Sequence, residues 1–329
     1  MKMVCFYNFE WEKEYLQKNL LGFEIRFIKG TTAETSVFSD QEAQILCLFI
    51  DSPVSKELLK RFPSLKLIAT RSTGFNHIDS DAAKKLKISI CTVPAYGKHT
   101  VAEYTFGLMI IVMRKIYEAC SRVRAHDFSR EGLCGSDLCG KTLGVIGTGN
   151  IGSCVVKLGT AFGMNVCACD MKPNEELVCE NGCAYKTLAE LLFQSDIVTI
   201  HVPYNKGTHH LINEENIMQF KKGSFLINTA RGPIVQTSAL VKALKEGILA
   251  GAGLDVLEEE GAMTHALLGD HSRKESQTIV ENNYLIEHPH VIVTSHNAFN
   301  SYEARKILLD CTIENIKNFV GGHPTHLVL

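Results

Sequence analysis

Several features that would point to particular classes of protein are missing from this chain of 329 residues. The formal net charge is −2, too small for a long-range field that would attract nucleic acid or an anionic membrane. No apolar run approaches the roughly 20 residues that span a bilayer. The twelve cysteines contain no C-x-x-C pair, so we expect no metal site. Small-molecule chemistry is the function class that remains.

Residues 1–8 also lack the pattern of a secretion signal, a charged stretch before a long apolar segment and a small-residue cleavage site. Disulfides are rare in the reducing cytosol. Because no signal accompanies the twelve cysteines, we expect them to be free thiols in a cytoplasmic protein.

The length and the pattern of apolar segments predict two domains. Single hydrophobic cores stop growing at roughly 250 to 300 residues, and this chain is longer. Short β-rich segments alternate with helical patterns, which is typical of βαβ units and parallel sheets. The first series of predicted strands covers 3–7, 23–28, 45–49, 65–69 and 88–92. The second covers 142–146, 165–169, 197–201, 224–228, 251–256 and 291–294. The sequence therefore predicts an α/β protein with two sheets.

Local signals predict where several helices begin and end. Two Thr-x-x-Glu capping boxes predict helix starts, at Thr100 with Glu103 and at Thr187 with Glu190. Left-handed helix caps are expected at Gly163 and Gly247. The first box precedes a helix that crosses from the first domain into the second. We expect a loop-rich segment over 261–283 and a closing helix over 302–320 that packs on the first domain.

A glycine-rich turn at 144–152 predicts a dinucleotide site. It reads G-V-I-G-T-G-N-I-G, and Gly147, Gly149 and Gly152 form G-x-G-x-x-G between a strand and a helix. These glycines permit a tight turn, a close approach of the backbone to a pyrophosphate, and close helix packing. The backbone of Asn150 and Ile151, at the helix N-terminus, is expected to face the phosphates.

Asp170 strengthens this interpretation because it ends the next predicted strand, about 20 residues further on. A carboxylate there accepts hydrogen bonds from the adenosine ribose hydroxyls and repels a 2′-phosphate. The sequence therefore predicts NAD as the cofactor in preference to NADP. Lys172 nearby is a cation that could offset part of this repulsion.

Polar residues after three later strands predict the chemistry. Arg231 follows the strand at 224–228, Glu260 follows 251–256, and His296 follows 291–294. A guanidinium can pair with the carboxylate of a 2-oxo acid and polarise its carbonyl. Histidine has an ordinary pKa close to neutrality and suits proton transfer to the new hydroxyl. Glu260 is then expected to hydrogen-bond the imidazole of His296.

Each of these residues also has a purely structural interpretation. An arginine can cap loop carbonyls, an acidic run at 258–260 can be a solvated face, and His296 is one of 13 histidines. Their shared position after strands of one domain, the domain with the dinucleotide signature, favours the functional interpretation. Asp255 at the end of its own strand is a further candidate, placed to accept a hydrogen bond from the nicotinamide carboxamide.

Over nearly its whole length, the chain resembles the D-isomer-specific 2-hydroxyacid dehydrogenase family. Five motifs carry the resemblance: RSTGFNHID at 71–79, VPAYGKHTVAE at 93–103, GVIGTGNIG at 144–152, HVPYNKGTHHLIN at 201–213 and INTARGPIV at 227–235. The resemblance implies two doubly wound domains with a cleft between them. Residues 1–99 and 297–329 would form a flavodoxin-like substrate-binding domain, and 100–296 a Rossmann NAD-binding domain. It also implies a homodimer.

The resemblance assigns roles to individual residues. Arg231, Glu260 and His296 match the catalytic arginine, glutamate and histidine of the family. The matches to its cofactor site include Val202, Pro203, Thr208, Thr229, Ala230 and Asp255. Backbone at Thr73 and Gly74 would hold the substrate carboxylate.

Tyr96, Phe299 and the long interval between Glu260 and His296 resemble the D-lactate dehydrogenase branch, which implies pyruvate reduction with NADH. Other substrates stay open, among them glycerate and 2-hydroxyisocaproate. A protein of the corepressor type that senses NADH is an alternative from a different class. The chain departs from the family pattern at Gly97, Lys98, Gly261 and Ser295.

Overall fold

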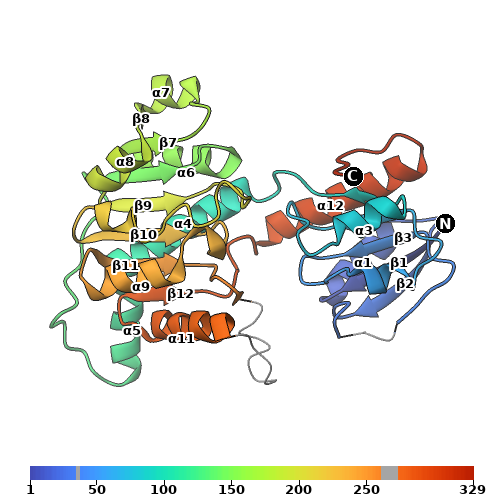
Figure 1. Cartoon of the computed structure of the whole chain (residues 1–329), viewed down its shortest axis with the longest axis horizontal. Helices are drawn as coiled ribbons and strands as arrows, with labels where there is room; N and C mark the ends of the chain where they lie inside the picture. The colour runs from blue at the N-terminus through green and yellow to red at the C-terminus, as the bar shows by residue number, and fades with distance from the viewer. Residues whose placement is uncertain (35–37, 261–272) are drawn as a thin grey trace. The chain divides into compact units, whose positions relative to one another are not determined.

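The computed structural model describes residues 1–34, 38–260 and 273–329 of the chain. The chain forms two compact units (Figure 1). Unit 1 consists of Met1–Tyr96 and Asn300–Leu329, and unit 2 of Gly97–Phe299. None of the described helices is both long and apolar enough to cross a membrane.

Unit 1 is a five-stranded parallel sheet with the order β2-β1-β3-β4-β5, the flavodoxin-like order. Its strands are β1 (Lys2–Tyr7), β2 (Glu24–Lys29), β3 (Ile45–Leu48), β4 (Leu67–Thr70) and β5 (Ser89–Cys91). Its helices are α1 (Glu10–Asn19), α2 (Lys56–Leu59), α3 (Ser80–Lys85) and α12 (Tyr302–Val320). The closing helix α12 packs on α1 and β4, so the prediction that it returns to the first domain is confirmed.

Unit 2 contains a seven-stranded parallel sheet with the order β12-β11-β10-β9-β6-β7-β8, which is a Rossmann arrangement. Its strands are β6 (Thr142–Ile146), β7 (Asn165–Cys169), β8 (Ala184–Tyr185), β9 (Ile197–Ile200), β10 (Ser224–Asn228), β11 (Leu249–Leu254) and β12 (Val291–Val293). Its helices are α4 (Lys98–Met113), α5 (Ile116–Arg124), α6 (Asn150–Ala161), α7 (Glu175–Asn181), α8 (Leu188–Gln194), α9 (Thr237–Lys245) and α11 (Arg273–Glu287). The 3-10 turns are η1 (Ile217–Gln219) and η2 (Gly232–Ile234).

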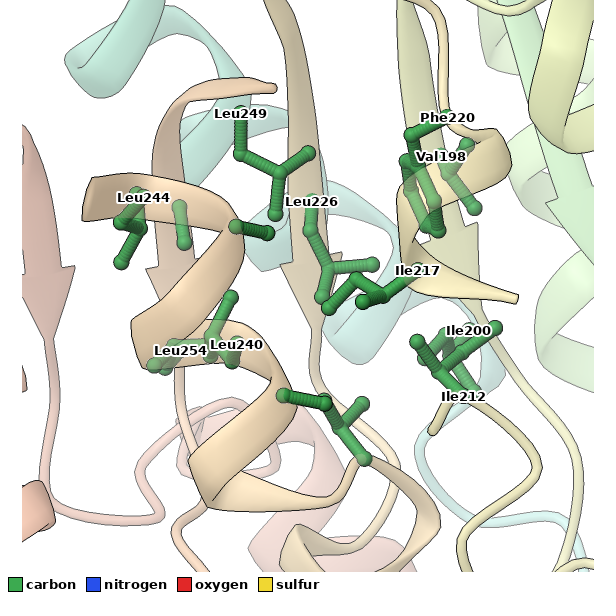
Figure 2. Close-up of a cluster of buried hydrophobic side chains, with 14 of the residues drawn as sticks. Val198, Ile200, Ile212, Ile217, Phe220, Leu226, Leu240, Leu244, Leu249 and Leu254 are labelled. Atoms are coloured by element: carbon green, nitrogen blue, oxygen red, sulfur yellow. The ribbon is translucent and has the colours of Figure 1, made fainter. Parts of the chain in front are cut away.

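Each face of the unit 2 sheet has its own hydrophobic core. On one face α9 lays Leu240 and Leu244 against β10 and β11 (Figure 2). On the other face α4 and α6 cover the sheet with side chains such as Phe106 and Val155. Because helices cover both faces of the sheet, the central strand β9 is buried throughout. Burial of a leucine side chain such as Leu240 or Leu244 stabilises the fold by about 1.5–3 kcal/mol. The two cores thereby hold the strands and their carboxyl ends in place.

The local predictions have mixed outcomes. The capping box of Thr187 and Glu190 is present at the start of α8. Gly163 and Gly247 have the expected left-handed backbone, with φ of +73° and +67°. The box at Thr100 and Glu103 is wrong, because α4 begins at Lys98 after Gly97. Thr100 therefore lies inside the first turn of the helix and does not precede it.

The predicted loop over 261–283 is wrong in its second part. Residues 261–272 lie outside the described part of the chain, whereas α11 begins at Arg273. Among the residues of this helix whose side chains are described, 277–287, the buried ones are Thr278, Asn282 and Leu285. Two of these three residues are polar, so the positions of the apolar residues alone do not show the helical period.

Candidate active site

The residues singled out in unit 2 follow the carboxyl ends of its strands. The strand order reverses between β6 and β9, which are neighbours in the sheet although β7 and β8 come between them in sequence. Ligands of open α/β sheets bind outside the strand ends at such a point. The loops after β6, β9, β10, β11 and β12 contain most of the predicted residues.

The glycine-rich turn has the shape that a dinucleotide requires. Gly147 has a φ of +90°, and a Cβ on Gly152 would lie 1.9 Å from the Gly147 carbonyl oxygen, so these glycines close the turn. A Cβ on Gly149 would meet nothing within 4 Å, which leaves that position open. Helix α6 begins at Asn150, and no side chain caps its first amides. These amides of Asn150 and Ile151 suit a phosphate.

Asp170 connects the end of β7 to this turn. Its Oδ2 accepts hydrogen bonds from the Thr148 amide at 2.6 Å and hydroxyl at 3.0 Å, and its Oδ1 from the Lys172 amide at 2.9 Å. Burial raises the pKa of Asp170, but the hydrogen bonds from Lys172, Thr148 and Met171 outweigh it and hold the pKa below its usual range. A carboxylate has about four acceptor sites, so capacity remains for a ribose hydroxyl.

Thr148 and Tyr185 also support Asp170, although no sequence pattern indicates it. The Tyr185 hydroxyl donates to Thr148 Oγ1 at 2.9 Å and accepts from the Asn174 amide. Tyr185 lies on β8, a strand of two residues that was too short to predict. These bonds fix the Thr148 hydroxyl that holds Asp170.

The other residues assigned to the cofactor site shape the loops after β9 and β10. Thr208 Oγ1 donates to the Pro203 carbonyl oxygen at 2.6 Å, which closes the turn after Val202. Thr229 is 8% exposed, and its hydroxyl lies 2.9 Å from that of Thr105 on α4. The Ala230 amide donates to Asn228 Oδ1 at 3.0 Å.

Glu260 and His296 meet, as predicted. His296 Nδ1 lies 2.8 Å from Glu260 Oε1, and Glu260 Oε2 accepts from the Leu257 amide at 3.3 Å. Because an ionised carboxylate only accepts, His296 Nδ1 is the donor, and its Nε2 is the nitrogen left for a substrate. The neighbouring Glu258 makes different contacts, so the geometry distinguishes among the three glutamates of the acidic run.

Asp255 supports the loop that carries His296. It is 1% exposed, and its Oδ1 accepts from the Thr294 hydroxyl at 2.6 Å and the Asn297 amide at 2.8 Å. Its Oδ2 accepts from the Ala298 amide at 2.8 Å, and its carbonyl oxygen from the His296 amide. His296 itself has a φ of +52°. The contacts made by Asp255 therefore hold a backbone turn that most residue types disfavour.

Arg231 lies beside the loop after β11, which contains the acidic run 258–260, because the neighbouring Gly232 packs on that loop. A Cβ on Gly232 would lie 1.9 Å from the Leu257 carbonyl oxygen and 2.4 Å from the Glu258 nitrogen. The half-buried guanidinium of Arg231 donates to the Ala230 carbonyl oxygen at 2.6 Å. The arginine loop and the loop bearing Glu260 are thus in direct contact.

The residues predicted to bind substrate are divided between the two units. Phe299 of unit 2 makes an edge contact with His296, with ring centroids 6.4 Å apart. Thr73, Gly74 and Tyr96 belong to unit 1. There the Thr73 hydroxyl donates to the Val93 carbonyl oxygen at 2.6 Å, and the Gly74 carbonyl oxygen accepts from Ser72 at 2.7 Å.

Comparison with known proteins identifies the family. The model of the D-isomer specific 2-hydroxyacid dehydrogenase NAD-binding domain matches residues 106–298. D-lactate dehydrogenase of Escherichia coli (strain K12) is 34% identical over 336 residues, which cover 100% of both chains. The 2-hydroxyacid dehydrogenase homolog 1 of Schizosaccharomyces pombe is 37% identical over 326 residues, 98% of this chain and 97% of that protein. The crystal structure of D-lactate dehydrogenase from Aquifex aeolicus, complexed with NAD and lactic acid, has a TM-score of 0.83 at 36% identity, covering 98% and 96% of the two chains.

The chain belongs to the D-isomer-specific 2-hydroxyacid dehydrogenase family, because the family model covers more than half of it. It is an NAD-dependent oxidoreductase, and both the family and the cofactor predicted from the sequence are confirmed. The predicted fold of two parallel-sheet α/β domains is confirmed as well.

Proposed function

We propose that the chain is a D-lactate dehydrogenase that interconverts pyruvate and D-lactate. The observation that carries the proposal is the hydrogen bond of 2.8 Å between His296 Nδ1 and Glu260 Oε1, next to the loop of Arg231. The aromatic ring of Phe299 beside His296 suits a substrate with a short side chain. Relatives named D-lactate dehydrogenase support this choice of substrate.

In the proposed mechanism each side chain has one task. Arg231 binds the substrate carboxylate and polarises the adjacent carbonyl. His296 donates a proton from Nε2 to the carbonyl oxygen, and takes it back when lactate is oxidised. Glu260 holds the imidazole through Nδ1, so that Nε2 stays directed to the substrate. When NADH is bound, its nicotinamide supplies the hydride.

The cofactor would be held by the residues whose geometry suits it. The turn at Gly147, Gly149 and Gly152 and the amides of Asn150 and Ile151 would hold the pyrophosphate. Asp170 would accept hydrogen bonds from the adenosine ribose. The loops at Val202, Pro203, Thr208, Thr229 and Ala230, together with Asp255, would hold the nicotinamide half. In unit 1, Thr73, Gly74 and Tyr96 are the residues that we propose to bind the substrate.

Steady-state absorbance at the NADH band tests the substrate. Pyruvate should be reduced with a higher kcat/KM than 2-oxo acids with longer side chains. Selectivity is expected to be modest, because each methylene changes it by about 1–3 kcal/mol. A chiral assay of the product should find D-lactate. Preferential turnover of a branched 2-oxo acid, or formation of L-lactate, would contradict the proposal.

We also propose a cytoplasmic homodimer. All twelve cysteines are free thiols, which suits a reducing compartment.

Unit 2 exposes apolar side chains on and after α5, including Tyr117 at 62% and Phe128 at 77% exposure. A second copy of the chain would cover them. Light scattering should give twice the chain mass, and Phe128→Glu with Tyr117→Glu should shift it to the monomer mass. A monomeric wild-type protein would refute the dimer.

A further inference from the structure

A second histidine–carboxylate pair lies in unit 2, outside the proposed catalytic set. His210 Nε2 lies 2.7 Å from Glu258 Oε1. Glu258 Oε2 accepts from the Thr237 amide at 3.1 Å and from its hydroxyl at 2.8 Å. The Glu258 side chain is only 13% exposed, so its charge is satisfied mainly by these protein groups.

Through these contacts Glu258 joins four segments of the unit. His210 belongs to the loop after β9, and its amide also donates to the Pro233 carbonyl oxygen in the loop after β10. Thr237 is the first residue of α9, where a carboxylate is favourable to the helix N-terminus. The Glu258 carbonyl oxygen accepts from Asn282 Nδ2 on α11 at 2.8 Å, and Asn282 is fully buried. The loop after β11 is thereby held by His210 and Thr237 through the Glu258 side chain, and by Asn282 through the Glu258 backbone.

The carboxylate is stabilised in its charged form. Burial raises the pKa of Glu258, but hydrogen bonds from His210 and Thr237 outweigh this effect and hold the pKa below its usual range. If the carboxylate were removed, the Thr237 amide and the His210 ring would lose their partner. Buried polar groups without a partner are costly, so the loop would rearrange to reach water.

We propose that Glu258 is a positioning residue of the dehydrogenase, which places Glu260 for its contact with His296. Glu260 is two residues further on, and its Oε2 accepts from the Leu257 amide adjacent to Glu258. Glu259 between them has a left-handed φ of +55°, so the two glutamates lie on a sharply turned backbone that depends on outside support. This inference rests on the proposed function, in which His296 transfers the proton.

Steady-state kinetics of Glu258→Ala, Glu258→Gln and Glu260→Ala with pyruvate and NADH test the proposal. A misplacement of about 1 Å in an active site can cost a factor of about 100. We therefore expect Glu258→Ala to lower kcat by roughly 10- to 100-fold, while the Kd of NADH measured by fluorescence stays within about threefold of wild type. Glu258→Gln should recover part of the loss, because its amide oxygen still accepts from Thr237.

A double-mutant cycle separates positioning from loss of stability. If Glu258 acts through Glu260, Glu258→Ala should lower kcat by less than about threefold in the Glu260→Ala background. Glu190→Ala is the matched control, because it removes a glutamate that supports the N-terminus of α8. It should lower the melting temperature and leave kcat unchanged.

The outcomes distinguish this inference from the proposed function. If wild-type protein reduces no 2-oxo acid, the proposed function fails. If wild type is active and both Glu258 variants keep its kcat, the positioning role alone is overturned. Additive losses in the cycle would also overturn it, since they would show that Glu258 acts independently of Glu260.

Discussion

Replacing Gly232 with alanine should lower the activity strongly, although it changes no proposed catalytic side chain. The new Cβ would lie 1.9 Å from the Leu257 carbonyl oxygen. A carbon and an oxygen in ordinary contact are about 3.3 Å apart, so one of the two loops must move by about 1.4 Å. Both atoms that collide with the Cβ at the shortest distances belong to the Leu257 backbone, so no side-chain rotation relieves the contact.

The size of the effect follows from this displacement. A shift of about 1 Å in an active site can cost a factor of about 100 in rate, and overpacking costs about 1–3 kcal/mol of stability. We expect Gly232→Ala to lower kcat/KM for pyruvate by about 100-fold or more and to lower the melting temperature. Stopped-flow or steady-state NADH oxidation and a thermal melt measure the two effects separately.

Gly107→Ala provides the matched control. Gly107 lies within α4, and a Cβ there would meet nothing within 4 Å. Alanine is favoured over glycine in a helix interior by about 0.5–1 kcal/mol, so this variant should be at least as stable as wild type and fully active. If Gly232→Ala kept the wild-type kcat/KM, catalysis would not depend on the close contact between the loop of Arg231 and the loop of Glu260, and the prediction would be wrong.

Two further predictions concern the cofactor and the dependence of stability on pH. Asp170→Ser should lower the ratio of kcat/KM for NADH over NADPH by roughly 10- to 100-fold, because a charge repulsion of about 1–4 kcal/mol is removed; an unchanged ratio would show that Asp170 does not face the 2′ position. Burial lowers the pKa of His77 to about 4, so between about pH 6.5 and 4 the unfolded chain binds a proton that the folded chain does not. The free energy of unfolding should therefore fall as the pH drops through this window, by up to about 1.4 kcal/mol per pH unit from this residue. Denaturant melts at several pH values should show that the free energy of unfolding of His77→Gln changes less steeply with pH than that of wild type. An equal dependence on pH would contradict the prediction.

The order and type of most elements could be predicted from the sequence, because parallel strands and their helices leave strong apolar patterns. The strands at 142–146, 165–169 and 224–228 were located to the residue. Helix α11 was missed because it buries polar residues such as Asn282, and β8 because two residues carry no pattern. Where polar contacts replace apolar burial, periodicity does not reveal the element.

The sequence was enough to predict the catalytic residues of the candidate site, but not the residues that hold them in position. Position after a strand was enough to single out Glu260 and His296, and their hydrogen bond was expected. The roles of Glu258 and His210 depend on loops that meet only in three dimensions, and 48 positions separate the two residues in the chain. Spacing along the chain cannot reveal such a contact without an alignment or a structure.

The kinetics of His296→Asn test most directly whether His296 transfers the proton. Asparagine tolerates the left-handed backbone at this position, where φ is +52°, so the loop held by Asp255 should keep its shape. We expect kcat for pyruvate reduction to fall by roughly 100- to 10,000-fold, while NADH binds as tightly as to wild type. A variant that retains wild-type kcat would contradict the claim that His296 transfers the proton.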